Sequence, residues 1–186
     1  MQEDNKNKKE LKFRKLNADE IDVRVSQCSE KGVSLLLYKD ARVDMRILDE
    51  TVGALNWQKE YKRDNQNCVV SVWDETKQAW ISKEDTGTES NTEKEKGLAS
   101  DSFKRACFNW GIGRELYSAP RIWVGADKAN IKANGKDARG NTKFACYDKF
   151  SVREIEYNDK GEISYLRIGN MTKEKGAYLY GKKADK

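Results

Sequence analysis

Residues 101–117 read DSFKRACFNWGIGRELY, and their small and apolar residues recur at helical spacing. At about 100° per residue, one half of the helical wheel holds Ser102, Phe103, Ala106, Cys107 and Trp110. The opposite half holds two adjacent cations, Lys104 and Arg105, with Phe108 beside them. The pattern predicts an amphipathic helix, and a solvated face is the usual reason for such charges. The alternative is that the two cations hold an anionic ligand.

The same helix is expected to begin several turns before the two cations. Thr92 and Glu95 match a capping box, in which each side chain satisfies a backbone N–H group of the first turn. The preceding residues, DTGTESN, are turn formers. Two further cations, Lys94 and Lys96, then fall in the first turn of this helix.

A hairpin and a second helix are predicted ahead of this segment. The strands IDVRVSQ and VSLLLYKD flank a turn at Gly32. Residues 41–55 then repeat apolar residues at spacings of three, four and one, which is typical of one buried helical face. Arg42 and Arg46 lie four residues apart and therefore share a different face near the start of that helix.

The remaining strands complete the predicted fold. Residues 57–86 predict a three-stranded meander, whose DETKQ turn sets Val70, Val72 and Trp73 against Trp80 and Ile81. A last hairpin, KFSVREIEYNDKGEISYLRIGN, turns at residues 158–161. The order of the elements predicts an α+β fold, in which an antiparallel sheet of meander and hairpins carries the helices on one side.

A chain of 186 residues is expected to form one domain with loose ends. The net charge of +5 permits a polyanionic partner without requiring one. Composition divides the chain into a basic flexible arm (residues 1–18), a core (19–124) and a Lys/Gly/Asn-rich flexible loop (125–143). A final hairpin with a basic tail (144–186) belongs to the same domain.

Composition also argues against several classes of function. The four cysteines, at positions 28, 68, 107 and 146, form no Cys-x-x-Cys pair, and histidine is absent, so we expect buried reduced thiols and no metal site. The lack of histidine removes the usual base of hydrolases, which predicts a protein that is not an enzyme and needs no cofactor. No apolar run approaches the roughly 18 residues of a membrane span, so we expect a soluble, cytoplasmic protein.

The order of these motifs resembles the Rad fifty-two family of single-strand annealing proteins and its phage recombinase relatives. That family has a strand leading into a basic residue at the start of a helix, here Arg42. A later helix carries Asp-x-x-Lys-Arg-Ala-x-x-x-aromatic-Gly, and the matching residues here are Asp101, Lys104, Arg105, Ala106, Trp110 and Gly111. The resemblance covers about residues 20–117.

This resemblance implies a subunit of a ring or helical homo-oligomer that binds single-stranded DNA and anneals complementary strands during recombination and repair. Arg42, Lys104 and Arg105 would line the floor of a basic groove, and Arg46 would extend it. Phosphate contacts by such cations need no base sequence. The resemblance also implies an exonuclease or a host single-strand binding protein as a further partner. If the chain is phage-encoded, its compartment would be the cytoplasm of the bacterial host.

The sequence departs from the family pattern at three places. Phe108 stands where better-known members carry another cation, one turn beyond Arg105, and we interpret it as a packing residue rather than a base-stacking one. Ala54 replaces an aromatic residue that follows the glycine of the first helix. The segment before the second helix is shorter, so Lys94 and Lys96 would have to supply any second, outer DNA site.

Two other functions fit parts of the sequence. A nonspecific single-strand coating protein would share the basic groove without promoting pairing. A metal-dependent nuclease could use Asp74, Glu75 and Lys77 of the DETK segment, although residues of these types are also common in turns. The five tryptophans are interpreted as core or interface residues, with Trp73 and Trp80 as a cross-strand pair.

Overall fold

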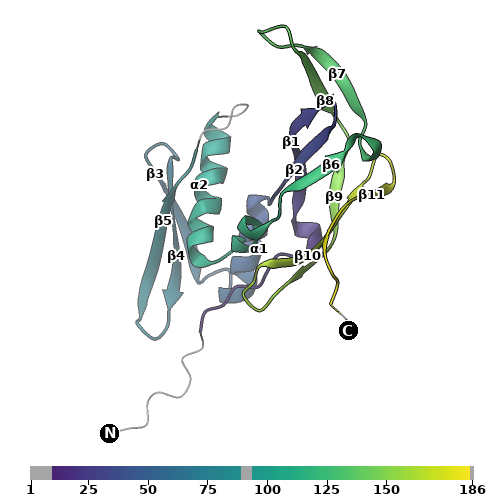
Figure 1. Ribbon diagram of the computed structural model, residues 1–186. Helices are drawn as coiled ribbons and strands as arrows, with labels where there is room; N and C mark the ends of the chain where they lie inside the picture. The colour runs from purple at the N-terminus through teal and green to yellow at the C-terminus, as the bar shows by residue number, and fades with distance from the viewer. Residues whose placement is uncertain (1–9, 89–93, 185–186) are drawn as a thin grey trace. The chain divides into compact units, whose positions relative to one another are not determined.

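The computed structural model describes residues 10–88 and 94–184, and the side chains of residues 94–96 lie outside the description. The chain forms two compact units (Figure 1). The helical unit consists of residues 1–14 and 41–112, and the sheet unit consists of residues 15–40 and 113–186. No helix in the described part of the chain is long and apolar enough to cross a membrane.

The helical unit combines two helices with a three-stranded antiparallel meander. Its elements are α1 (Ala41–Val52), β3 (Trp57–Lys62), β4 (Asn67–Asp74), β5 (Ala79–Thr86) and α2 (Lys94–Trp110). The strand order is β3-β4-β5, and the central strand β4 is the most deeply buried. Helix α2 packs on β4 and β5, while α1 packs on α2 and β3 (Figure 1). The predicted meander and its two helices are therefore confirmed.

The buried face of α2 agrees with the helical spacing in the sequence. Ser102, Phe103, Ala106 and Cys107 are all 0% exposed. Helix α1 ends at Val52, three residues earlier than predicted, because Gly53 adopts a positive φ of 88° that stops the helix. The Asn56 amide then donates to the Val52 carbonyl oxygen, which closes the last turn.

The sheet unit places the two predicted hairpins in one six-stranded antiparallel sheet. The strand order is β11-β10-β9-β1-β2-β6. The strands are β1 (Asp22–Ser29), β2 (Gly32–Tyr38), β6 (Ile122–Gly125), β9 (Phe150–Tyr157), β10 (Ile163–Asn170) and β11 (Lys175–Gly181). This sheet is separate from the meander, whereas the sequence suggested one sheet. The segment assigned to a core, residues 19–124, accordingly contributes to both units.

The segment expected to be a flexible loop contains regular structure. Strands β7 (Ile131–Lys136) and β8 (Thr142–Cys146) pair as an antiparallel hairpin. Asp137 builds its turn, because one carboxylate oxygen accepts the backbone N–H groups of Arg139 and Asn141. Strand β11 likewise lies in the segment expected to be a basic tail. Three short 3-10 helices complete the chain: Ala18–Glu20, Arg114–Ser118 and Ala126–Lys128.

Cys68 on β4 provides a prediction about alkaline pH. Its side chain is 0% exposed, and burial raises the pKa of the thiol from 9.0 to about 11. An unfolded chain ionises this thiol at lower pH than the folded chain, so its contribution to stability is complete below pH 9 and disappears between pH 9 and about pH 11. That contribution is roughly 2 to 3 kcal/mol.

Urea denaturation at a series of pH values checks this expectation. Wild type should lose stability more steeply above pH 9 than Cys68→Ala, which lacks the ionising thiol. Parallel pH profiles for the two proteins would contradict it.

Candidate nucleic-acid interface

Several residues of the Lys-Arg-Ala motif attach α2 to its own unit. The Asp101 carboxylate accepts hydrogen bonds from the Thr88 backbone N–H at 2.8 Å and the Thr88 hydroxyl at 3.0 Å. The Trp110 indole N–H donates to the Val70 carbonyl oxygen at 2.9 Å. Gly111 follows the helix with a φ of 105°, a conformation that favours glycine. These residues have structural roles that explain their places in the motif.

The side of α2 that meets the sheet is tightly packed. Phe103 stacks against Trp57 with ring centroids 6.2 Å apart, and the Lys59 ammonium lies 4.6 Å from the centroid of the Phe103 ring. Ala106 and Cys107 beside it are fully buried. A larger residue at position 106 would have to displace a neighbouring element, because Ala106 is 0% exposed and α2 packs on β4, β5 and α1.

Lys104 and Arg105 lie in the middle of α2, away from this packing. Arg105 is exposed, and its Nε donates to the Asp85 carboxylate of β5 at 3.2 Å. The Asn109 amide also donates to Asp85, at 3.2 Å. Lys104 is half-buried, and within residues 10–88 and 97–184 its ammonium has no hydrogen-bond or ion-pair partner. The two cations therefore differ: Arg105 shares its charge with a carboxylate, and Lys104 does not.

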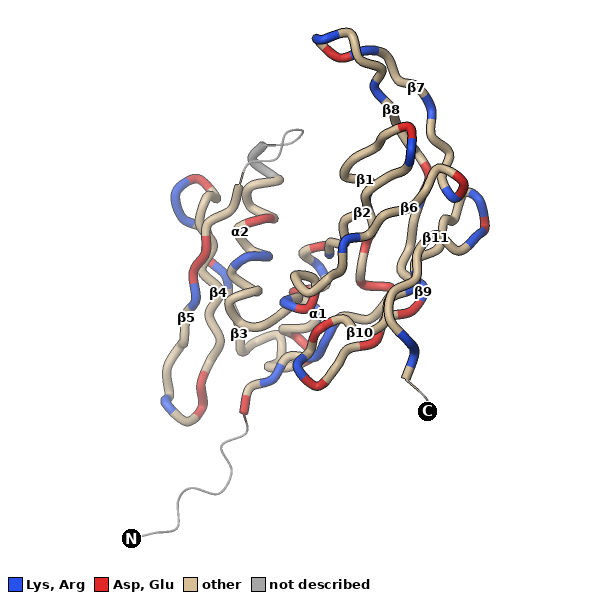
Figure 2. Tube along the Cα trace, viewed as in Figure 1, with Lys and Arg blue, Asp and Glu red and all other residues tan. Residues whose placement is uncertain are grey.

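Helix α1 contributes the other two predicted cations that the structure describes. Arg42 lies in the first turn and Arg46 one turn later, and both side chains are exposed. Because α1 packs on α2, the four cations lie on neighbouring helices of one unit (Figure 2). Lys94 and Lys96 belong to the first turn of α2, but their side chains lie outside the described residues, as does the Thr92 capping box.

The aromatic residues have protein partners. Trp73 and Trp80 form the expected cross-strand pair, with ring centroids 5.5 Å apart in an edge-to-face arrangement. The Trp57 indole N–H donates to Asp49 at 2.6 Å. Phe108 is half-buried, and Ala54 is exposed in the turn after α1. These contacts favour packing roles for Trp57, Trp73 and Trp80.

The DETK segment builds a turn. One oxygen of the Asp74 carboxylate accepts the backbone N–H groups of Thr76 at 2.9 Å and Lys77 at 3.1 Å. These hydrogen bonds, led by the one from Lys77, lower the pKa of Asp74. The side chain that a nuclease would need for a metal ion is thus engaged in holding the turn between β4 and β5.

Sequence reasoning overlooked two lysines on the strands that face α2. Lys83 on β5 lies with its ammonium 4.6 Å from the centroid of the Trp110 ring, and it donates to the Asn109 carbonyl oxygen at 2.8 Å. Lys59 on β3 lies over Phe103 as described above. Both occupy alternate strand positions on the helix-facing side, so the period-2 pattern of the meander was the signal that could have identified them.

Comparison with curated proteins reveals a relative. The chain is similar to the single-stranded DNA-binding protein DdrA of Deinococcus radiodurans, with 31% identity over 106 residues. The alignment covers 54% of this chain and 50% of DdrA, so the chain spans about half the length of that relative. No protein-family model matches the chain. No solved structure matches it.

The ion pair between Arg105 and Asp85 yields a prediction about anion binding. Asp85→Asn removes the carboxylate that competes for the Arg105 guanidinium, so we expect affinity for a single-stranded oligonucleotide to rise by roughly threefold to tenfold. The melting temperature should change little, since an exposed ion pair contributes about 0–1 kcal/mol. Fluorescence anisotropy with labelled oligothymidylate measures the affinity.

Glu60→Gln is the matched control for Asp85→Asn. It removes one carboxylate from the same sheet, at an exposed position on β3 that pairs with Val69 and so faces away from α2. Equal effects of the two substitutions would show a general charge effect and would contradict a specific role for Arg105.

Proposed function

We propose that the protein binds single-stranded DNA through the cations of α1 and α2 and acts in DNA repair. The observation that carries the proposal is Lys104, an ammonium group without a described protein partner beside the exposed Arg105 guanidinium. The similarity to a protein named for single-stranded DNA binding supports the same ligand. Contacts from lysine and arginine to phosphates would give binding that does not depend on base sequence.

The electrostatics of α1 favour the same ligand. Arg42 lies in the first turn, where its charge adds to the positive end of the helix dipole, and the buried Asp44 of the same turn offsets part of this potential. A phosphate near this end of α1 would meet both the arginine and the helix terminus. Arg46, one turn further along, would extend the contact to the next phosphate. Lys94 and Lys96 would extend it from α2.

The finer proposal is that the bound strand is annealed to a complementary one. The basis is the motif resemblance to the Rad fifty-two family, together with the protein partners of Trp57, Trp73, Trp80 and Trp110. A protein that contacts phosphates while the rings of Trp57 and Trp110 pack within the protein would keep the bases exposed for pairing. Homo-oligomerisation in a ring or filament would repeat the contacts along the strand and increase affinity without new side chains.

Annealing and coating are separated by one measurement. Two complementary oligonucleotides, labelled with a fluorophore and a quencher, are mixed with and without the protein. We expect the protein to accelerate quenching, because phosphate neutralisation lowers the repulsion between the strands. A protein that binds each strand but slows quenching is a coating protein, and one that binds neither strand contradicts the proposed function. Electron micrographs with and without DNA would show whether rings or filaments form.

A further inference from the structure

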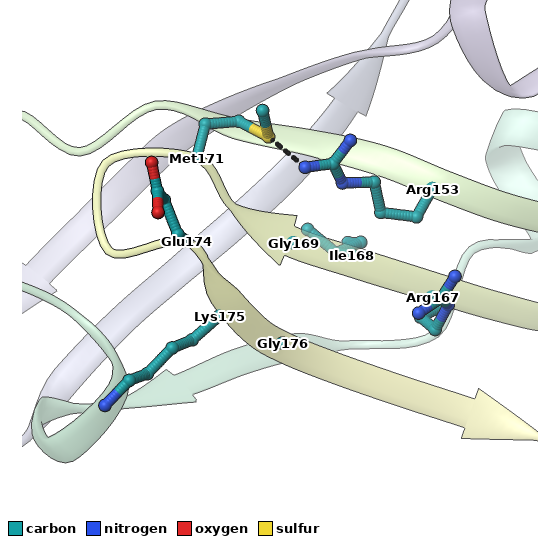
Figure 3. A pocket seen from close by; sticks show the side chains of 8 residues that line it. All are labelled: Arg153, Arg167, Ile168, Gly169, Met171, Glu174, Lys175 and Gly176. Atoms are coloured by element: carbon teal, nitrogen blue, oxygen red, sulfur yellow. Dashed lines mark hydrogen bonds between the residues drawn. The ribbon is translucent and has the colours of Figure 1, made fainter.

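The sheet unit carries a cleft of about 530 Å³, lined by residues of strands β9, β10 and β11 and of the turn between β10 and β11. Figure 3 shows the cleft and the side chains around it. Its lining residues are Arg153, Arg167, Ile168, Gly169, Met171, Glu174, Lys175 and Gly176. The cleft therefore combines three cations and one carboxylate with two glycines, of which Gly176 has no heavy atom within 4 Å of an added Cβ.

Arg153 is the most distinctive residue of this cleft. It falls at an irregularity in the pairing of β9 with β10, where Arg167 pairs with Glu154 and Ile168 pairs with Val152. Its side chain crosses Gly169, since a Cβ atom at Gly169 would lie 2.8 Å from the Arg153 Nε. Gly169 thus allows the arginine to lie across the neighbouring strand.

The hydrogen-bond partner of Arg153 is a weak acceptor. Its Nη2 points at the Met171 sulfur, 2.7 Å away, as Figure 3 shows. A thioether accepts hydrogen bonds poorly, and within the described residues no carboxylate pairs with Arg153. An exposed guanidinium in this position keeps most of its five donors available for an anion.

Arg167 supplies the second positive group. It pairs with Glu154 on β9, and Lys183 shares the same carboxylate at 2.8 Å, so the acid is balanced by two cations. In Figure 3 the Lys175 ammonium points away from the two arginines. Arg153 and Arg167 are therefore the two cations that a ligand in the cleft would meet.

The floor of the cleft is backbone. Gly169 and Gly176 lie opposite each other on β10 and β11. A Cβ atom added at Gly176 would meet no heavy atom within 4 Å, so the space above that residue is open. Leu179, which is 62% exposed, lies opposite Arg167 and adds an apolar surface next to the charged one.

We propose that this cleft binds a phosphate group of a nucleic-acid strand. A guanidinium can contact two oxygens of one phosphate, and the open space above Gly176 lets the sugar–phosphate chain approach strand β11 closely. The exposed Leu179 and Met171 side chains offer contact to a sugar or base. The identity of the ligand rests on the proposed function, and the cleft would give the sheet unit its own contact to DNA, separate from the cations of the helical unit.

Two variants test the cleft in different ways. Gly176→Thr fills the open space with a residue that suits strands, at a position where an added Cβ meets nothing and the backbone φ is ordinary. Arg153→Gln removes the guanidinium. Arg139→Gln is the control, because it removes one arginine from an exposed turn of the same unit outside the cleft.

The readout is the NMR signal of the Gly169 amide in the full chain. It is followed while an oligothymidylate without terminal phosphates, or inorganic phosphate alone, is added. We expect saturable shifts with the oligonucleotide in wild type and Arg139→Gln, and about tenfold weaker binding at the cleft in both cleft variants. Lys104→Ala should leave the dissociation constant reported by Gly169 nearly unchanged, which distinguishes this contact from the one on α2.

Two outcomes would overturn the proposal. One is no shift of Gly169 with the oligonucleotide; if inorganic phosphate still shifts this signal, the cleft binds an adventitious ion only. The other is equal binding by wild type, Gly176→Thr and Arg153→Gln. Shifts at Gly169 without any effect of Lys104→Ala and Arg105→Ala on total affinity would instead contradict the proposed role of α2 and leave the cleft supported.

Discussion

The double variant Lys104→Ala/Arg105→Ala should bind single-stranded DNA about 100-fold more weakly than wild type. Each cation is expected to contribute about tenfold, the usual range for a hydrogen bond to a charged group. Loss of Arg105 also leaves the Asp85 carboxylate without its ion-pair partner, and that negative charge would then repel a phosphate. The slope of affinity against salt should decrease by about 1.4, which is two contacts of about 0.7 each.

Anisotropy titrations at several salt concentrations measure both quantities. Lys62→Ala is the control, because it removes one lysine charge from the same unit on the side of the sheet that faces away from α2. We expect less than a threefold change for this control, since a distant exposed charge is largely screened. If the double variant keeps both the affinity and the salt slope of wild type, α2 is not the DNA contact.

Phe103→Ala should destabilise the helical unit by about 3–5 kcal/mol, the usual cost of removing a buried aromatic side chain. Phe103 is 0% exposed and belongs to the face of α2 that packs on the sheet. Its removal leaves a cavity beside Trp57 and takes away the ring over which the Lys59 ammonium lies.

Urea denaturation followed by tryptophan fluorescence measures this loss. Phe108→Ala provides the comparison, because it removes the same side chain from a half-buried position on the same helix, and we expect it to cost less than half as much. Equal losses of unfolding free energy in the two variants would show that the buried position of Phe103 contributes no more to stability than the half-buried position of Phe108. Hydrogen exchange would show whether the loss is confined to residues 41–112 or extends through the chain.

The elements that could be predicted from the sequence are those with a regular local pattern. The spacing of Ser102, Phe103, Ala106 and Cys107 fixed the buried face of α2, and alternation identified the meander and both hairpins. Such patterns depend on contacts within one element or between neighbouring strands, so the spacing of apolar residues in the sequence is enough to predict the element.

The features that could not be predicted depend on contacts between distant residues. The pairing of β1 with β9, for example Val23 opposite Phe150, joins segments from the two ends of the chain and decides which strands share a sheet. The Arg105–Asp85 ion pair depends on the register of α2 against β5, which helical spacing does not determine. The β7–β8 hairpin was missed because its turn depends on the Asp137 side chain, and its few apolar residues, such as Ile131 and Phe144, share a face only once the two strands pair.

The interrupted path of the chain through the sheet unit has a consequence for biosynthesis. Residues 41–112 form one stretch between β2 and β6, strands that pair with each other, as Leu35 does with Ile122. On a ribosome, the whole of this stretch emerges before β6, β9, β10 and β11 exist. Residues 41–112 can therefore fold early, whereas β1 and β2 lack their pairing partners, β9 and β6, until those strands have been synthesised. Premature termination after residue 112 would release a folded middle flanked by an unprotected hairpin, a species prone to aggregate.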